Sequence, residues 1–340
     1  YCAYGVLCFL ATQSLLRGSQ AKKVAVILAL YGVAMAAFAL LEGVAPNGKL
    51  YWVRQPRLGG WIYGPYVNHN HYAGLMELLV PIPLVISLSE IAQEKTRIAA
   101  GIAAAIMVGT IFLSGSRGGM VAIFVELVVV ATLLSRQKKS MRFAFGVGAF
   151  GVVLISLLAW LGGKELTSRV SSISTEARGE ISGGMRVSID HDTIQMFRYR
   201  PVLGWGLGTF PVVYPQFRSF YTNFFVNEAH NDYLQLLAEM GLLGFGSMLW
   251  FLLVVFRRAW HKIHRWPTDV SGAVTLACTL GIVGILIHSL FDFNLQIPAN
   301  AAFFYVFCTI AAAPPLLQRS RKRRPVSSEE EEFLPASEVV

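Results

Sequence analysis

Nine long apolar segments limit the folds that this chain can adopt. Each is close to the length that a helix needs to cross the hydrocarbon core of a bilayer, nominally ~20 residues. Backbone N–H and C=O groups need internal partners in lipid, so spanning segments of this kind are helices. The sequence predicts an all-α, polytopic integral membrane protein with about nine transmembrane helices, which cover approximately residues 1–16, 24–41, 72–89, 98–114, 118–134, 143–162, 241–256, 271–291 and 298–317.

The distribution of charge supports a membrane protein and argues against nucleic acid as a partner. Charged residues make up 14% of the chain, against roughly 25% in soluble domains. Of the 29 basic residues, 18 lie in alternate connections between the predicted spans or in the tail, which all fall on one side of the predicted membrane. Under the positive-inside rule, this pattern places the N-terminus outside and the C-terminus in the cytoplasm. The basic connections are expected to contact anionic membrane lipid.

Four regions follow from this topology. Residues 1–162 hold predicted transmembrane helices one to six, and residues 241–318 hold helices seven to nine. Between them, residues 163–240 are expected to form a large helical segment on the periplasmic side. Residues 319–340 combine a basic run with a run of glutamates, which predicts a disordered cytoplasmic tail. All four cysteines lie in apolar segments without ligand-type spacing, so we interpret them as small core residues.

A polar cluster around His230 leads directly into the apolar segment at 241–256. Asn227 or Asn231 is a candidate N-cap, and a glycine follows at the far end. If the helix begins near Glu228, His230 lies in its first turn, where the helix dipole favours the neutral imidazole that a general base needs. The alternative is an interfacial histidine that only binds backbone groups.

Two arginines lie in settings that suit an anion. Arg117 stands in the run Ser-Gly-Ser-Arg-Gly-Gly at 114–119, between two long apolar segments. The glycines allow close backbone approach to a ligand, and a guanidinium can bind phosphate with two hydrogen bonds. The alternative is a plain tight turn with an outward-pointing arginine. Arg186 is either a second anion ligand or a solvated loop residue.

Two histidine motifs admit structural interpretations. His69 and His71 lack a neighbouring carboxylate other than Glu77, which lies inside a predicted span, so a metal site is disfavoured. These histidines are expected to anchor and cap a helix end, with substrate contact as the alternative. His288 and Asp292 share a helix face at spacing i, i+4, which indicates a mutual pair that closes the helix end, with substrate contact as the alternative.

These motifs together resemble the O-antigen ligase and polymerase family of polytopic membrane glycosyltransferases. The resemblance covers about residues 60–315. It rests on the 114–119 run, on the Arg186 segment with Pro-Val-Leu-Gly-Trp-Gly-Leu-Gly-Thr-Phe at 201–210, and on Glu-Ala-His-Asn-Asp-Tyr-Leu-Gln at 228–235. It implies a GT-C-like fold. Family members usually have more spans, so further N-terminal spans are expected upstream of Tyr1.

The resemblance implies transfer of a glycan from a polyprenyl-diphosphate carrier to an acceptor hydroxyl, at the periplasmic face of the bacterial inner membrane. The acceptor is lipid A-core in ligases, another carrier-linked repeat in polymerases and a protein side chain in related enzymes. By motif position, Arg117 and Arg186 look like the residues that hold the diphosphate, and His230 looks like the residue that activates the acceptor. Ser116, Asn231 and Asp232 are expected to contact substrate beside them. Neither metal nor nucleotide cofactor is implied.

Two alternatives lie outside this class. A transporter would place charged groups near the bilayer midplane and often shows inverted repeats. Glu77 and Glu126 are the only acidic residues well inside predicted spans, and we detect no repeat. A structural membrane protein without chemistry is less consistent with the gathering of Arg, His, Asn and Asp on one face. The glycines of 204–208 follow no strand, which argues against a nucleotide loop.

Overall fold

The computed structural model describes residues 2–14, 18–56, 60–135, 183–222 and 225–314. Within these ranges the chain is helical, and its strand-like pairing is confined to two isolated bridges, Leu50 with Arg54 and Tyr63 with Tyr66. The all-α prediction is therefore confirmed for the described residues. The predicted span at 143–162 and the predicted tail at 319–340 lie outside them.

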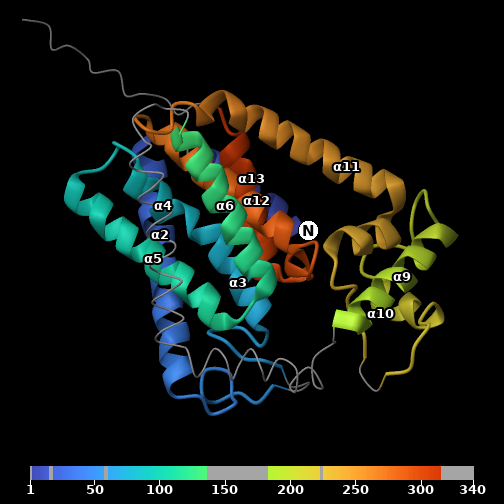
Figure 1. The fold of residues 1–340 in the computed structure, drawn as a ribbon. Helices are drawn as coiled ribbons and strands as arrows, with labels where there is room; N and C mark the ends of the chain where they lie inside the picture. Colours follow the sequence, from blue (N-terminus) through green and yellow to red (C-terminus); the bar gives the residue numbers. More distant parts are fainter. Residues whose placement is uncertain (1, 15–17, 57–59, 136–182, 223–224, 315–340) are drawn as a thin grey trace, which may run out of the picture.

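The helices follow the apolar pattern of the sequence (Figure 1). They are α1 (Cys2–Ser14), α2 (Gly18–Val44), α3 (His69–Leu79), α4 (Pro81–Leu88), α5 (Glu94–Ser114), α6 (Arg117–Ser135), α9 (Gly183–Tyr199), α10 (Phe210–Val213), α11 (Asp232–Ile263), α12 (Val270–His288) and α13 (Pro298–Ala312), with short 3₁₀ turns η1 (Tyr214–Gln216) and η2 (Asn294–Gln296).

Six of the described helical stretches are long and apolar enough to cross a membrane. They are Gln20–Val44, His69–Leu88, Glu94–Ser114, Arg117–Leu134, Asp232–Ile263 and Val270–His288. The apolar helices α1 and α13 are shorter. The chain is thus a multi-pass membrane protein, while nine spans and their orientation stay predictions. The predicted turn at 114–119 is present, since α5 ends at Ser114, Gly115 has φ 75° and α6 begins at Arg117.

Helix α12 is the central helix of the bundle. It packs against α3, α4, α6, α11 and α13. Glycines on α12 allow this close packing, because a Cβ at Gly281 would lie 2.8 Å from the backbone oxygen of Leu78. The surrounding core is almost wholly aliphatic and aromatic, and it includes Leu75, Met76, Met107, Ile111, Ile282, Ile285, Phe304 and Phe307.

Helix α11 is bent by Gly241, which has φ 61° and ψ −167° inside an otherwise helical run. Such a backbone is almost restricted to glycine. The free N–H groups of the second half are satisfied from the 201–208 segment, because Leu242 N donates to Pro201 O at 2.8 Å and Leu243 N to Val202 O at 3.2 Å. The glycine-rich segment therefore caps a helix that restarts after the bend.

A second, smaller core lies beside the first half of α11, where Figure 1 shows α9 and α10 next to the bent helix. The stretch 189–199 packs on this core, where Ile189 and Met196 are buried with Phe210, Tyr214 and Val226. Phe225 is exposed. Part of the predicted 163–240 segment is therefore a packed helical unit, not an extended loop.

Candidate active site

Most of the polar side chains that stand out in the sequence gather at one end of the helix bundle. The start of α3, the turn between α5 and α6, the start of α11 and the loop after α12 meet there, and α9 packs against α11. Asp292 lies at the centre, and its side chain is 1% exposed. Asp292 Oδ2 accepts a hydrogen bond from Asn70 Nδ2 at 2.7 Å, and Oδ1 accepts one from the backbone N–H of Phe293 at 2.9 Å.

His230 binds the same carboxylate. Its Nδ1 lies 3.3 Å from Asp292 Oδ1, and its ring meets Phe293 edge to face with centroids 4.8 Å apart. A carboxylate only accepts hydrogen bonds, so Nδ1 carries the hydrogen and Nε2 keeps its lone pair in the neutral ring. The His230 side chain is 12% exposed, so it is held in place and still reachable.

His230 precedes α11 and is not part of its first turn. Of the two candidate N-caps, Asn231 is confirmed, and the alternative of a helix that begins near Glu228 is wrong, because α11 begins at Asp232. Asn231 Oδ1 accepts from the backbone N–H groups of Tyr233 and Leu234, both at 3.1 Å. His230 has φ 55°, a left-handed conformation that is uncommon outside glycine and recurs at functional sites.

Two side chains at the start of α11 hold the loops on either side of the site. Gln235 Oε1 accepts from the Ala229 N–H at 2.9 Å, and Gln235 Nε2 donates to Glu228. Asp232 Oδ2 accepts from Ser289 Oγ at 2.8 Å and from the Leu295 N–H at 3.0 Å. Asp232 therefore ties the start of α11 to the loop after α12. The predicted substrate contacts of Asn231 and Asp232 stay predictions.

Arg186 approaches Asp292 from α9. Its Nη2 lies 3.7 Å from Asp292 Oδ2, and its Nη1 donates to the Phe291 carbonyl at 2.8 Å. The side chain is 29% exposed. Of the two interpretations of Arg186, a freely solvated loop residue is wrong, because the guanidinium is docked on the loop after α12. Arg186 and His230, far apart in sequence, thus meet on one carboxylate.

Ser116 and Arg117 begin α6 at the same end of the bundle. Ser116 is buried; its Oγ accepts from the Gly119 N–H at 3.2 Å and lies 3.5 Å from His288 Nε2. The next residue, Arg117, has an exposed side chain. Gly118 lies against the His288 ring, since a Cβ there would come within 2.4 Å of His288 Cδ2. The structure therefore places the Arg117 backbone beside the site but does not join its side chain to Asp292.

His288 does not pair with Asp292, contrary to the prediction from their spacing. Its Nδ1 lies 2.8 Å from Glu77 Oε1, in a contact where both side chains are almost fully buried. The reason is a turn after the last residue of α12, where the backbone N–H groups of Phe291 and Asp292 bond to the His288 carbonyl. Asp292 is therefore free to face Asn70 and His230.

The histidines at the start of α3 have the helix-end role that we expected. His69 Nδ1 donates to the Ser114 carbonyl at 2.8 Å, and its ring stacks on Trp61. His71 Nδ1 lies 3.5 Å from Asn294 Oδ1, and Asn68 caps the helix. Among the described residues, no group of three or more His, Cys, Asp or Glu side chains is arranged to hold a metal ion.

The comparison with known families adds an independent observation. Residues 102–249 match the family model described as O-antigen ligase. This part of the chain is similar to the O-antigen ligase family. The matched segment contains Arg117, Arg186 and His230, so all three lie in the family domain. Among curated proteins, none matches the chain.

The O-antigen ligase family comprises membrane glycosyltransferases of the ligase and polymerase type, and the chain has the multi-pass helices that such an enzyme needs. The resemblance that the motifs suggested is therefore confirmed at the level of the family. The donor, the acceptor, the membrane face and the roles of single residues are questions for the proposal below.

Burial and nearby charges shift the pKa values of two carboxyl groups at the site, Asp292 and Asp190, in opposite directions. Burial alone would raise the pKa of Asp292, but the hydrogen bond to His230 and the nearby Arg186 hold that pKa below its usual value. Burial raises the pKa of Asp190 to about 6, against smaller opposing effects of His230 and Arg186. Asp190 Oδ1 is buried without a hydrogen-bond partner in the described structure. Burial also raises the pKa of Glu228.

Two residues of this site were missed in the sequence. The sequence analysis pairs Asp292 with His288. The signal for a separate role is that Asp292 is a lone carboxylate between two phenylalanines at the end of an apolar span. Asp190 was passed over although it lies four residues after Arg186, a spacing that places both side chains on one helix face. The sequence alone does not show that Asp292 contacts Asn70 on α3, or that both aspartates interact with His230 in the loop before α11.

Proposed function

We propose that this membrane glycosyltransferase transfers a glycan from a polyprenyl-diphosphate carrier to an acceptor hydroxyl, with lipid A-core as the preferred acceptor. The observation that carries the proposal is the meeting of His230 and Arg186 on Asp292, at one end of the bundle. A base beside a cationic group is the pair that such a transfer needs, because the acceptor loses a proton while the carrier leaves as a diphosphate.

His230 acts as the general base in this proposal. Asp292 accepts from Nδ1, so Nε2 takes the proton of the acceptor hydroxyl as its oxygen bonds to the anomeric carbon of the donor glycan. The bond between that carbon and the diphosphate oxygen breaks, and the electron pair leaves with the carrier. Proton transfer to a positioned base typically contributes 10²–10⁴-fold to the rate. The rigid loop clamped by Gln235 supports this role.

Arg186 and Arg117 stabilise the departing diphosphate. Arg186 Nη1 donates one hydrogen bond to the Phe291 carbonyl, and Nη2 lies at the longer distance of 3.7 Å from Asp292. A guanidinium has five N–H donors, so others are left for a phosphate oxygen. Arg117 presents an exposed guanidinium at the start of α6, on the same end of the bundle. Two arginines can neutralise the leaving group in the way that a metal ion does elsewhere, so we propose metal-independent transfer.

The polar site is proposed to face the periplasm in the bacterial inner membrane. The opposite end of the bundle carries basic connections such as Lys22–Lys23, Lys95–Arg97 and Arg257–Arg258, which the positive-inside rule assigns to the cytoplasm. The 163–240 region then belongs to the periplasmic side, between six upstream spans and three downstream spans. Lipid-linked donors fit that face because nucleotide sugars are absent from the periplasm.

The test is reconstitution of transfer with the purified full chain. A polyprenyl-diphosphate glycan is offered with three separate acceptors: lipid A-core, a second carrier-linked repeat and an acceptor protein. The proposal expects transfer to lipid A-core with release of polyprenyl diphosphate, and expects the rate to survive a chelator. Transfer only to the carrier-linked repeat or only to protein would reassign the enzyme as a polymerase or a protein glycosyltransferase. Loss of activity on chelation with rescue by a divalent ion would contradict metal independence.

A further inference from the structure

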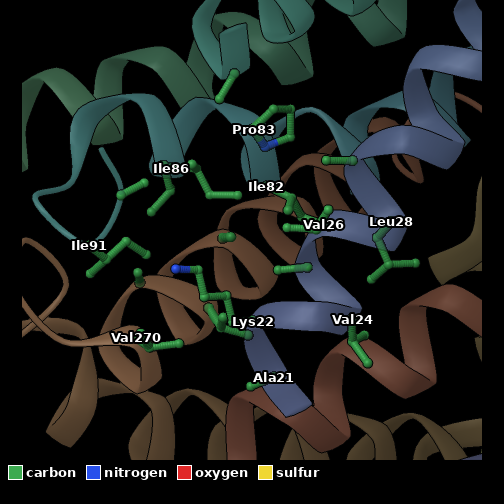
Figure 2. A pocket seen from close by; sticks show the side chains of 18 of the residues that line it. Ala21, Lys22, Val24, Val26, Leu28, Ile82, Pro83, Ile86, Ile91 and Val270 are labelled. Carbon is green, nitrogen blue, oxygen red and sulfur yellow. The ribbon is translucent and has the colours of Figure 1, made fainter. Parts of the chain in front are cut away.

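An apolar pocket lies between α2, α4, α5 and α12 (Figure 2). Its volume is about 210 Å³, whereas a single water molecule needs roughly 10–15 Å³. Apolar cavities of this size stay dry and bind apolar ligands. The space is therefore suited to a hydrocarbon group and not to a cluster of water.

The pocket lies at the opposite end of the bundle from Asp292. Along α12 it is lined from Val270 to Cys278, and the polar site begins only after His288. Helices α2 and α5 approach closely at Gly32, where a Cβ would come within 2.4 Å of Met107 Cε. The residues of α2 that line the pocket begin at Ala21 and end at Val33, so the cavity lies on the basic side of that crossing.

The lining of the pocket is aliphatic with one charged residue. Its walls are made mainly of small and branched side chains, among them Ala25, Ala29, Ile82, Ile86, Ala99 and Ala277. Among the described residues that line it, Lys22 is the one charged residue, and none is Asp or Glu. Figure 2 shows the Lys22 side chain among the apolar side chains of the pocket, and Lys22 is an exposed residue near the start of α2. A cation at the edge of an apolar cavity complements an anionic headgroup attached to a hydrocarbon chain.

The surroundings are those of a lipid-facing groove. Ile27 and Leu30 on α2 and Ile98 and Ile102 on α5 are exposed, so bilayer chains can reach the pocket from the side. Further basic side chains, Lys23, Lys95 and Arg97, lie at the same end of these helices. In a multi-pass membrane protein, basic side chains at such positions concentrate anionic lipid at the membrane surface in general, whereas only a residue that lines the pocket can select what fills it.

We propose that this pocket binds one acyl chain of an anionic glycerophospholipid, whose phosphate pairs with Lys22. The lipid is a bound component of the helix bundle and not a substrate, because the pocket and the Asp292 site lie at opposite ends of α12. It fills the space that the side chains of α2, α4, α5 and α12 leave between these helices.

The test uses the full chain in nanodiscs with phosphatidylglycerol that carries a diazirine in one acyl chain. We expect crosslinks on pocket residues of α2, α5 and α12, and weaker crosslinking by phosphatidylcholine with the same chain. Lys22→Gln should reduce the preference for phosphatidylglycerol about five-fold, the equivalent of one charge contact. Lys23→Gln is the matched control, because Lys23 is adjacent but does not line the pocket.

A second variant separates the chain site from the headgroup site. Ala25→Phe places a ring in the cavity and should abolish crosslinking on pocket residues for both lipids, while circular dichroism and the unfolding temperature show a folded protein. Equal labelling by both lipids, or an equal effect of Lys22→Gln and Lys23→Gln, would overturn the assignment of an anionic lipid. Preferred labelling by a diazirine-tailed polyprenyl phosphate, or no labelling because another segment fills the pocket, would also overturn it.

Discussion

The Asp292 carboxylate accepts hydrogen bonds from Asn70, Phe293 and His230, and Arg186 lies nearby at 3.7 Å. A buried carboxylate needs such partners, because an unpaired charge is strongly destabilising away from water. The contact with Asp292 also fixes the orientation of the His230 ring. Asp292 is thus stabilised by its neighbours and in turn orients His230, the proposed base. At the residue scale, Asp292 is a positioning residue for His230 and Arg186.

Asp190 gives a pH-dependent prediction for stability. Its pKa is raised from 3.8 to about 6 by burial, so the folded protein disfavours the charged form. The contribution of Asp190 to the free energy of unfolding is therefore greatest below pH 3.8, the ordinary pKa of the group, where the carboxyl is neutral in the folded and the unfolded chain. That contribution is lost as the pH rises through about 6, the pKa in the folded protein. Asp190→Asn should therefore raise the unfolding temperature at pH 7.5 and leave it nearly unchanged at pH 4. Thermal unfolding in one detergent checks this, with Glu94→Gln in the exposed first turn of α5 as a control. A rise of equal size at both pH values would contradict the prediction.

Arg117 tests the geometry of phosphate binding. Arg117→Lys keeps the charge but loses the planar fork that binds two phosphate oxygens at once. We expect donor affinity and transfer rate to fall well beyond the effect of Arg257→Lys, an exposed change on the opposite end of the bundle. Binding of a polyprenyl-diphosphate glycan and single-turnover transfer measure the two quantities. Unchanged affinity and rate in Arg117→Lys would return Arg117 to a plain turn residue.

At the scale of elements, α11 is two helices joined at a bend that the 201–208 segment holds in place. Trp205 N donates to Ala238 O at 3.1 Å, and Gly206 N to Glu239 O at 2.8 Å. Glu239 binds the N–H groups of Gly208 and Phe210 with its side chain. The segment therefore satisfies the last carbonyls of the first half and the first N–H groups of the second half. This connection fixes where the first half, and with it the His230 loop, lies against the bundle.

Gly241 tests this account of the bend. A Cβ there would lie 2.3 Å from the Val202 carbonyl oxygen, and the backbone has φ 61°. Gly241→Ala should destabilise the protein by about 1–3 kcal/mol from the backbone strain alone, with further loss from the steric overlap. Gly246→Ala is the matched control in the same helix, with open space around the added Cβ, and should be neutral or stabilising by up to about 1 kcal/mol. Denaturant unfolding of both variants compares the two. Equal stability would show that the bend does not depend on glycine.

The elements were largely predictable, because apolar length is a local property of the sequence. All the described predicted spans overlap helices, and the break at Ser114–Arg117 follows from the glycines around it. The start of α11 was misplaced, since Glu228 binds Gln235 instead of joining the helix, and Asn231 caps it. The pairing of Asp292 was missed because its partners lie in α3, in α9 and before α11. Spacing along the chain reports neighbours on one helix face, whereas this site is built across several elements.

At the scale of the molecule, the two ends of the bundle differ in chemistry. One end carries Asp292, His230 and Arg186, and the other carries basic residues and the apolar pocket beside Lys22. Helix α12 connects these ends through the aliphatic core. Such an arrangement suits an enzyme that works at one membrane surface and is anchored to anionic lipid at the other.

Single cysteines test this orientation. In a cysteine-free background, Tyr221→Cys lies on the polar end and His264→Cys on the basic end, and both native side chains are exposed. An impermeant thiol reagent added to intact cells with a permeable outer membrane should modify Tyr221→Cys and spare His264→Cys until the inner membrane is opened. The reverse pattern would place the polar end of the bundle in the cytoplasm and contradict the proposed topology.

The most direct measurement of the central claim is the turnover of His230→Ala beside its affinity for the donor, in the same nanodisc. A base acts on the acceptor proton and not on the diphosphate, so donor affinity should stay near normal while turnover falls about 10²–10⁴-fold. The acid limb of the pH–rate profile should flatten as well. His264→Ala, an exposed histidine on the opposite end of the bundle, should retain both affinity and turnover. Near-normal turnover of a folded His230→Ala protein would contradict the general-base role and leave His230 as an interfacial histidine.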